Sequence, residues 1–218
     1  GSLEYRREGQ PATLLNLLQT YYPEAITARQ MIMEWLGRYL ENIVARAEPL
    51  PPCPALAHDQ VWQASFAELP PIIKDAVGSF WEQAHLLGQR TGELHAALAK
   101  LRGPAFEAEP FTPTYQCELY QTARKRVTKT WHQLRTDNTL SEQVQTSAKQ
   151  VLNLQEKFLA ELHEILEHPY ESLRIRTHGD YHLAQVLYTG KDFIVIDFEG
   201  MPTASLATRR SKQSPLRD

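Results

Sequence analysis

The stretch THGDYHLAQVL at residues 177–187, together with IVIDFEG at residues 194–200, decides the fold class of this chain. The first stretch carries histidines, an aspartate and an amide, and the second carries two acids after a run of branched apolar residues. Residues 189–192, Thr-Gly-Lys-Asp, have the composition of a hairpin turn, so residues 185–188 and 193–196 are predicted to be its strands. Such a hairpin brings the residues at its open end together.

The spacing of three residues matches a known arrangement for phosphoryl transfer. In protein kinases a base aspartate lies five residues before a metal-binding amide, and a metal-binding aspartate follows the next hairpin. Here Asp180 lies five residues before Gln185, and Asp197 follows Gln185 by twelve. A carboxylate can orient an acceptor hydroxyl and take its proton, which is the role we expect for Asp180. Amide and carboxylate oxygens suit Mg²⁺, which is the role we expect for Gln185 and Asp197.

The segment from His178 to His182, with its sequel, resembles the aminoglycoside phosphotransferase-like family, whose usual form is His-Gly-Asp-x-His-x-x-Asn followed by Ile-Asp. Within that family, Tyr181, the glutamine at 185 and Asp-Phe-Glu-Gly at 197–200 look most like maltokinases, which occur alone or fused to trehalose synthase. The resemblance implies Mg²⁺ as cofactor, ATP as co-substrate and maltose as acceptor, giving maltose 1-phosphate. A trehalose synthase domain is an implied partner.

The resemblance also implies an α+β, mostly α-helical chain, the C-terminal lobe of a protein kinase-like fold with a small β-hairpin at the active site. Residues 1–50 are expected to lead from a missing N-lobe, and residues 51–218 to form a lobe truncated at its C-terminus. No Gly-x-Gly and no Val-Ala-x-Lys-type lysine precedes the catalytic loop, so the part that grips ATP is expected to be missing. We therefore expect this chain to be nearly inactive alone.

Three further residues are candidate active-site contacts. His178 is expected mainly to hydrogen-bond backbone and hold the loop, with direct contact to substrate as the alternative. His182 lies two residues beyond the proposed base, and Glu199 two residues beyond the proposed metal ligand Asp197, where they could face the substrate. A basic run at residues 124–126 is expected to be a solvated helix face rather than a phosphate site.

Helical periodicity predicts four long helices, at residues 23–47, 70–100, 114–134 and 139–169. The last is expected to begin with a capping box formed by Thr139 and Glu142. Gly88 and Gly92 share a face of the second helix, which suggests close approach of another backbone. Residues 103–113 are predicted to form a surface loop, residues 173–176 a strand, and residues 203–218 a poorly ordered end.

Composition excludes several classes of function. The formal net charge is −3, with 23 Lys and Arg against 26 Asp and Glu, so no nucleic-acid or anionic-membrane partner is expected. No apolar run approaches the roughly 18 residues of a membrane span. Cys53 and Cys117 form neither a CxxC pair nor a disulfide framework, which suits a reducing, cytoplasmic location.

Two other classes stay open at this point. His178, Asp180, His182 and Asp197 could instead bind two metals, as in metal-dependent phosphoester hydrolases, although further His and Asn clusters are missing. The chain could also be a non-catalytic packing or regulatory module beside trehalose synthase, because the phosphate-covering loop is absent. Tightly held zinc or iron in a metal analysis would support the hydrolase. A failure to bind ATP, Mg²⁺ and sugar would support the non-catalytic module.

Overall fold

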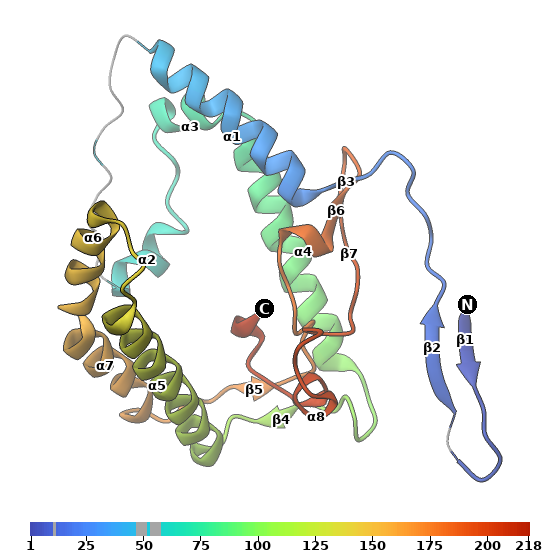
Figure 1. Ribbon diagram of the computed structural model, residues 1–218. Helices are drawn as coiled ribbons and strands as arrows, with labels where there is room; N and C mark the ends of the chain where they lie inside the picture. Colours follow the sequence, from blue (N-terminus) through green and yellow to red (C-terminus); the bar gives the residue numbers. More distant parts are fainter. Residues whose placement is uncertain (11, 47–51, 53–57) are drawn as a thin grey trace. The chain divides into compact units, whose positions relative to one another are not determined.

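The computed structural model (Figure 1) describes residues 1–10, 12–46, 52 and 58–218. The chain divides into two compact units. Unit 1 consists of residues 1–94 and 178–202, and unit 2 of residues 95–177 and 203–218. The predicted boundary at residues 50 and 51, as well as Cys53, lies outside the described residues.

Unit 1 combines helices with small antiparallel sheets. Its elements in chain order are β1 (Ser2–Tyr5), β2 (Thr13–Leu17), β3 (Ile26–Thr27), α1 (Ala28–Ala45), α2 (His58–Ala64), α3 (Pro71–Val77), α4 (Phe80–Lys100, ending in unit 2), η2 (Leu183–Gln185), β6 (Val186–Tyr188) and β7 (Phe193–Val195). β1 pairs with β2, and the second sheet has the order β3-β6-β7. Tyr188 pairs with Phe193 across the turn, which confirms the predicted hairpin.

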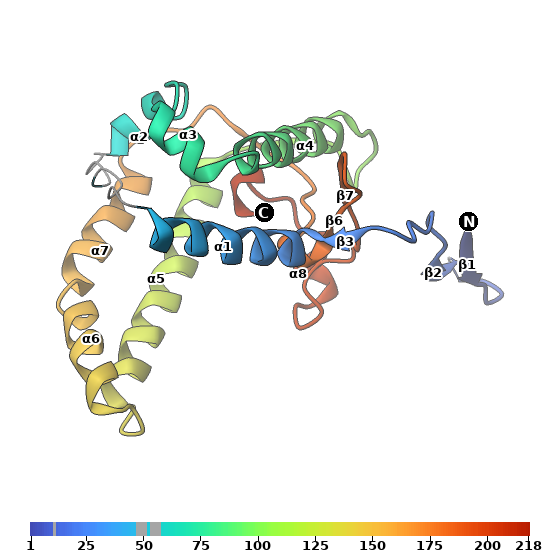
Figure 2. The same ribbon diagram turned by 90° about the horizontal axis from the view of Figure 1, so that it is seen from above.

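A small apolar core holds this hairpin against the helices of unit 1. Val186 and Phe193 pack with Ala28 and Met31 of α1, and all four side chains are buried. Full burial of one such aromatic or aliphatic side chain contributes about 1.5–3 kcal/mol. Figure 2 shows β3 running directly into α1, so that the strand beside β6 and the helix over it are one continuous piece of chain.

Two predicted helices of unit 1 differ from the observed ones. The helix predicted from residue 23 begins at Ala28, because Thr27 is extended and its side chain caps the helix by accepting from the N–H of Gln30. Ile26 therefore belongs to a strand. The helix predicted over residues 70–100 is two helices, because Gly78 at φ +60° ends α3 and its N–H bonds Lys74.

The prediction that Gly88 and Gly92 meet another backbone is wrong within the described part of the chain. A Cβ placed on either glycine would find no heavy atom within 4 Å beyond its own helix and chain neighbours. The two glycines leave this stretch of α4 open rather than packed. Spacing along a helix shows which residues share a face, but not whether anything lies against that face.

Unit 2 is built around one long helix. Its elements are β4 (Glu109–Pro110), α5 (Pro113–Thr136), α6 (Glu142–Leu152), α7 (Gln155–His163), η1 (Glu164–Leu166), β5 (Leu173–Arg174), α8 (Leu206–Arg210) and η3 (Pro215–Arg217). α5 confirms the helix predicted over 114–134, and α6 and α7 run alongside it (Figure 2). Gln116 of α5 is buried and donates to the carbonyls of Ile165 and His168. These bonds attach α5 to η1 and to the residues that follow it.

The single helix predicted over 139–169 is wrong in two respects. The helix is interrupted at Asn153, whose N–H bonds the carbonyls of Lys149 and Val151, and it continues as separate segments α7 and η1. The capping box does not form, since Ser141 is the N-cap of α6, while Thr139 donates to Asp137. A strong apolar periodicity persisted across the break, which is why sequence alone joined the segments.

Residues 203–218 are ordered by contacts inside unit 2, so the predicted poorly ordered end is wrong. Lys212 donates to Glu109 at 2.7 Å, and Glu109 also pairs with Arg174 at 2.8 Å. The Lys212 ammonium, through its hydrogen bond, holds the pKa of Glu109 below its ordinary value. Ile175 exchanges two backbone hydrogen bonds with Gln213, so the strand predicted at 173–176 is confirmed in part.

The structure also bears on the predicted loop at residues 103–113, on Cys117 and on membrane-spanning helices. The predicted loop at 103–113 contains the two-residue strand β4, which pairs with β5. Cys117 is an exposed free thiol. Among the described helices, none has the length and apolar character needed to cross a membrane.

Candidate active site

The register of the β6–β7 hairpin brings Gln185 and Asp197 to the same open end. Val186 pairs with Val195, and one residue further the N–H of Ile196 donates to the carbonyl of Gln185 at 3.0 Å. Asp197 follows Ile196 directly. Gln185 and Asp197, the two predicted metal ligands, therefore lie on adjacent strands at neighbouring positions of the backbone.

His178 joins the loop of Asp180 to the strand before Asp197. Its ring is 1% exposed, and its Nε2 lies 2.7 Å from the carbonyl oxygen of Ile196. Its Nδ1 lies 3.3 Å from the backbone nitrogen of Asp180, which donates to it. Both contacts fit the neutral tautomer protonated at Nε2. The contacts are those of a residue that holds the loop.

Two glycines let the backbones of the loop and the strand end run close together. Gly179 and Gly200 both have positive φ, at +82° and +75°, a conformation that glycine adopts without steric cost. A Cβ at residue 179 would lie 3.5 Å from the Cα of Gly200. The N–H of Met201 donates to the carbonyl of Gly179 at 3.3 Å, a second tie across the site. The segment that carries Asp197 is thus bonded to the Asp180 loop on both sides.

The carboxylate of Asp180 is partly shielded but still reachable. Its side chain is 21% exposed, and one oxygen lies 3.8 Å from Nε2 of His182. That separation is too long for a hydrogen bond. The other ring nitrogen of His182 accepts from the N–H of Ala184 and caps η2. His182 is half exposed, and its cap fixes the turn that leads from Asp180 to Gln185.

Asp197 has an unusual backbone and an accessible carboxylate. Its φ is +60°, and no other described non-glycine residue has a positive φ. For an L-residue this conformation costs about 1–2 kcal/mol, although Asp tolerates it better than most. Asp197 and Glu199 are exposed, Gln185 is half-buried, and no side-chain hydrogen bond or ion pair in the described part of the chain engages Asp197 or Gln185.

The donor set fits Mg²⁺ better than a transition metal. Mg²⁺ binds through one or two carboxylates, keeps several waters and accepts phosphate oxygens, and a carboxylate such as Asp197 with an amide oxygen such as Gln185 is the kind of donor set that it accepts. Among the described residues no group of three or more His, Cys, Asp and Glu side chains could hold a metal. The two-metal arrangement of a hydrolase therefore has no support from the geometry of His178, whose ring is occupied by backbone.

The sequence matches the profile of the phosphotransferase enzyme family over residues 42–203, about three quarters of the chain. The chain belongs to this family. The match includes the loop at Asp180, the hairpin and Asp197, and the mostly helical architecture with small sheets is that of the kinase-like fold of this family. The predicted fold class is thereby confirmed.

Solved structures show the same fold. A glucosamine kinase in complex with glucosamine, ADP and inorganic phosphate matches 99% of this chain with a TM-score of 0.64 and 19% identity. Two further crystal forms of glucosamine kinase match with TM-scores of 0.61 and 0.51, at 18% and 20% identity, over 97% and 90% of this chain. The chain spans only about 40% of the length of these proteins, and 37% for the last.

In this member of the family, sequence analysis missed the residues that hold the candidate site from outside. Thr91 of α4 bonds the hydroxyl of Tyr181 at 2.7 Å, directly beside Asp180. Arg90 pairs with Asp192 in the hairpin turn at 2.7 Å. An apolar groove of about 300 Å³ lies next to these contacts, lined in part by Tyr181 and Thr91. Only the unusual Arg and Thr on the apolar helix face could have suggested these roles.

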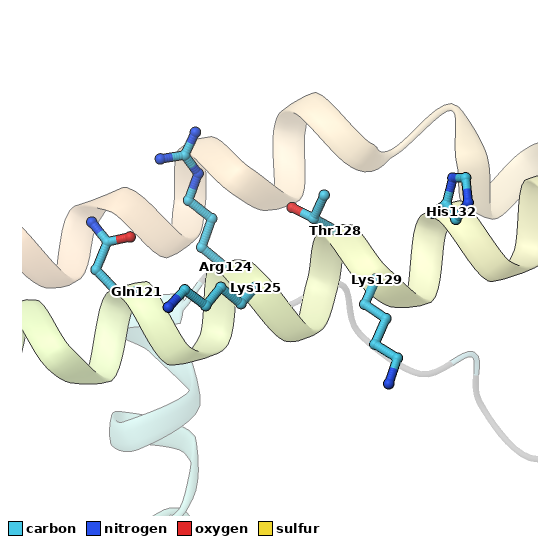
Figure 3. Close-up of a pocket in the computed structure, with 6 residues that line it drawn as sticks. All are labelled: Gln121, Arg124, Lys125, Thr128, Lys129 and His132. Atoms are coloured by element: carbon cyan, nitrogen blue, oxygen red, sulfur yellow. The ribbon is translucent and has the colours of Figure 1, made fainter.

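A larger hollow of about 520 Å³ is formed by residues other than the predicted site residues. It lies along α5 in unit 2 (Figure 3), and its lining residues are Gln121, Arg124, Lys125, Thr128, Lys129 and His132. All six come from one side of a single helix and are exposed, so the hollow is an open surface. None of the predicted site residues lines it. The basic run 124–126 contributes two of its cations and has the exposure of a solvated face.

We expect His178→Ala to lower the free energy of unfolding by about 1–3 kcal/mol, because it removes the buried partner of the Ile196 carbonyl and of the Asp180 N–H. Chemical denaturation followed by tryptophan fluorescence measures the change. His85→Ala, at an exposed helical position of the same unit, should change stability by no more than about 0.5 kcal/mol. Equal stability of the two variants would show that His178 does not hold the loop.

Proposed function

We propose that this chain carries the catalytic loop of an ATP- and Mg²⁺-dependent phosphotransferase that phosphorylates a sugar hydroxyl. Asp180 is the base, and Gln185 and Asp197 are the metal ligands. The observation that carries the proposal is the backbone connection of all three residues: Gln185 bonds Ile196 beside Asp197, and His178 bonds both Ile196 and Asp180. The side chains of Asp180, Gln185 and Asp197 thus extend from backbone segments that are hydrogen-bonded to one another.

The chemistry assigns a separate task to each side chain. The ionised carboxylate of Asp180 accepts the proton of the acceptor hydroxyl as its oxygen forms a bond to the γ-phosphorus of ATP. The bond from that phosphorus to the β–γ bridging oxygen breaks, and ADP leaves with the electron pair. Asp197 and Gln185 orient the nucleotide phosphates. Bound Mg²⁺ supplies neutralisation of the phosphate charge.

The exposures of the three residues suit these tasks. A base must reach substrate while keeping a fixed direction, and the Asp180 side chain is 21% exposed on a loop tied at both sides. A metal ligand must be free of competing ion pairs, and the described residues place none on Asp197. Asp197 also has a positive φ, which is an unfavourable backbone conformation. Such a conformation persists where the surrounding hydrogen bonds maintain it, as is common at functional sites.

Two likenesses suggest which sugar is the acceptor: the sequence motif and the similar solved structures. The motif around Tyr181 and Asp-Phe-Glu-Gly favours maltose, giving maltose 1-phosphate in trehalose and glycogen metabolism. The similar solved structures are of a kinase that binds glucosamine, at an identity that supports the shared fold alone. We propose maltose as the first acceptor to test, with glucosamine as the second, and a trehalose synthase domain or an N-lobe that grips ATP as the partner that completes the site. His178, His182 and Glu199 are proposed as the residues around it.

Titration calorimetry tests the function on this chain. We expect ATP to bind in the presence of Mg²⁺ and not in the presence of EDTA, and maltose to release more heat than glucosamine. Weak binding is expected, because no Gly-x-Gly loop and no Val-Ala-x-Lys-type lysine precedes Asp180 in this sequence to cover the phosphates. If ATP, Mg²⁺ and both sugars all fail to bind, the non-catalytic module is the better description. Tightly held zinc or iron would favour the hydrolase.

A further inference from the structure

The β6–β7 hairpin that carries the site residues is short. β6 and β7 make three residue pairs, and β3 adds two more on the other side of β6. The pairing with β3 and the apolar packing of Phe193 and Val186 on α1 hold the side of β6 and the start of β7. Apolar contact is non-directional, and neither contact reaches the turn at residues 189–192. A directional contact at the turn would therefore fix the angle of the hairpin further.

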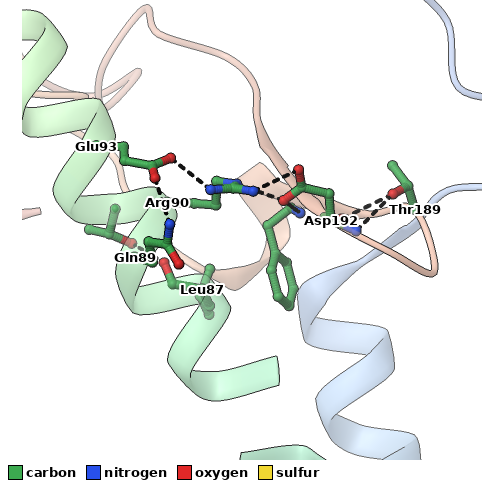
Figure 4. Close-up of polar contacts among 8 residues, drawn as sticks. Leu87, Gln89, Arg90, Glu93, Thr189 and Asp192 are labelled. Carbon is green, nitrogen blue, oxygen red and sulfur yellow. Dashed lines mark hydrogen bonds and ion pairs between the residues drawn. The ribbon is translucent and has the colours of Figure 1, made fainter. Parts of the chain in front are cut away.

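Arg90 of α4 grips the turn of the hairpin with a fork of two hydrogen bonds (Figure 4). Its Nε lies 2.7 Å from Oδ1 of Asp192, and its Nη2 lies 3.1 Å from Oδ2. The third nitrogen, Nη1, donates to Glu93 at 2.8 Å on the same helix. A planar guanidinium that meets a carboxylate with two parallel bonds fixes direction as well as distance.

Asp192 passes this constraint to both sides of the turn. Its Oδ1 also accepts from the N–H of Phe193, the first residue of β7, at 2.8 Å. Its own N–H donates to the hydroxyl of Thr189 at 3.1 Å. The hydrogen bond from Arg90 is the main reason that the pKa of Asp192 lies below its ordinary value, so the carboxylate stays ionised at neutral pH.

The same face of α4 contacts the other parts of the site. Gln83 lies 3.4 Å from the hydroxyl of Tyr188, and Thr91 lies 2.7 Å from the hydroxyl of Tyr181. Positions 90 and 91 follow position 83 by seven and eight residues, which is two helical turns, so all three lie on one side of the helix. One face of α4 therefore contacts the turn of the hairpin, β6 and the loop of Asp180.

We propose that Arg90 is a positioning residue, which through its fork to Asp192 sets the orientation of the β6–β7 hairpin and thereby the placement of Asp197 and Gln185. This inference rests on the proposed function, because it assigns a consequence to the metal ligands of that site. Arg90 and Asp192 are 31% and 45% exposed, so water screens the pair and it contributes orientation more than stability.

The short connection between the turn and Asp197 explains why a surface pair matters to a metal site. Asp197 lies five residues beyond Asp192, after the three residues of β7 and Ile196. A change in the angle of β7 at the turn is passed to Asp197 through these few residues. Metal–ligand distances tolerate only about 0.2 Å. A small loosening at the turn thus becomes a large loss of geometry at the ligands.

The test measures Mn²⁺ binding to the whole 218-residue chain, by electron paramagnetic resonance of the free ion. We expect Arg90→Gln and Asp192→Asn each to weaken Mn²⁺ affinity about threefold to tenfold, at or below the range known for groups that support metal ligands. The double variant should be no weaker than either single variant, because both remove one interaction. Arg90→Lys keeps the charge but loses the fork, and should show a smaller loss.

Glu93→Gln is the matched control. It removes the other acid partner of Arg90 and has the same change of charge as Asp192→Asn, but no hydrogen bond or ion pair in the described structure joins Glu93 to the hairpin. It should leave Mn²⁺ affinity unchanged. Hydrogen exchange gives a second readout: the amide of Ile196, bonded to Gln185, should exchange faster in Arg90→Gln than in Glu93→Gln.

The outcomes separate the two proposals. Unchanged Mn²⁺ affinity in a folded Arg90→Gln, or an equal loss in Glu93→Gln, overturns the positioning role but not the proposed function, provided that Asp197→Ala still weakens binding strongly. If the unmodified chain binds no Mn²⁺, or Asp197→Ala binds it equally well, the proposed function fails and the positioning role fails with it. If Arg90→Gln does not fold, Arg90→Lys and Asp192→Asn decide the question.

Discussion

Asp180→Asn lowers kcat for ATP-dependent sugar phosphorylation about 10²–10⁴-fold, the contribution expected of a positioned general base. Asparagine has nearly the shape of aspartate and can still accept a hydrogen bond from the sugar, but it cannot take the proton. The backbone ties through His178 and Gly179 do not involve the carboxylate and should persist. The fold and the metal site are therefore expected to survive the substitution.

Coupled detection of ADP, on the protein as the cell makes it, measures this loss. Mn²⁺ affinity of Asp180→Asn should stay within about twofold of the unmodified chain, because the base is not a metal ligand in this assignment. Asp75→Asn, an exposed acid of the same unit paired with Arg46, is the matched control and should keep full activity. Full activity of Asp180→Asn, or a parallel loss of metal binding, would contradict the role of base.

Asp197→Ala weakens Mn²⁺ and Mg²⁺ binding by at least about 10–100-fold, since even groups that only support a ligand have effects of that size. Asp197 is exposed and has no ion pair among the residues described, so its carboxylate is available to a cation. Alanine also lacks the side-chain hydrogen bonding that helps Asp adopt a positive φ, so a modest loss of stability should accompany the loss of metal.

The measurement is again electron paramagnetic resonance of Mn²⁺, with Mg²⁺ as a competing ion. Asp75→Ala gives the same change of charge at an exposed site in unit 1 and should leave the affinity unaltered. Asp197→Asn, which keeps an oxygen at the same place, should fall between the unmodified chain and Asp197→Ala. Equal affinity in all four proteins would show that the cation binds elsewhere, and the assignment of Asp197 would be lost.

Much of the candidate site could be predicted because its members are close in the sequence. Asp180, Gln185 and Asp197 span one loop and one hairpin, and the turn at residues 189–192 fixes which strand positions meet. The role of His178 as a holder of the loop followed from the same local motif, and both of its ring contacts are to backbone near that motif.

The supporting contacts could not be predicted, because they join residues far apart in the chain. Arg90 and Asp192 are 102 residues apart, and Lys212 and Glu109 are 103 apart. Helix periodicity predicted that α4 has an apolar face, but periodicity gives no partner for a residue on that face. For the same reason the open positions of Gly88 and Gly92 were wrongly expected to be covered.

The sequence by itself determined the mostly helical class, the hairpin and the spacing of the three oxygen-bearing residues, since turn chemistry and side-chain periodicity act over a few residues. Only the tertiary structure decided where the helices end, at Gly78 and Asn153, and that residues 203–218 are held by Glu109 and Ile175. The physical reason is that a helix end or a long-range ion pair depends on which other surface competes for the same groups, and that competition exists only once the chain has folded.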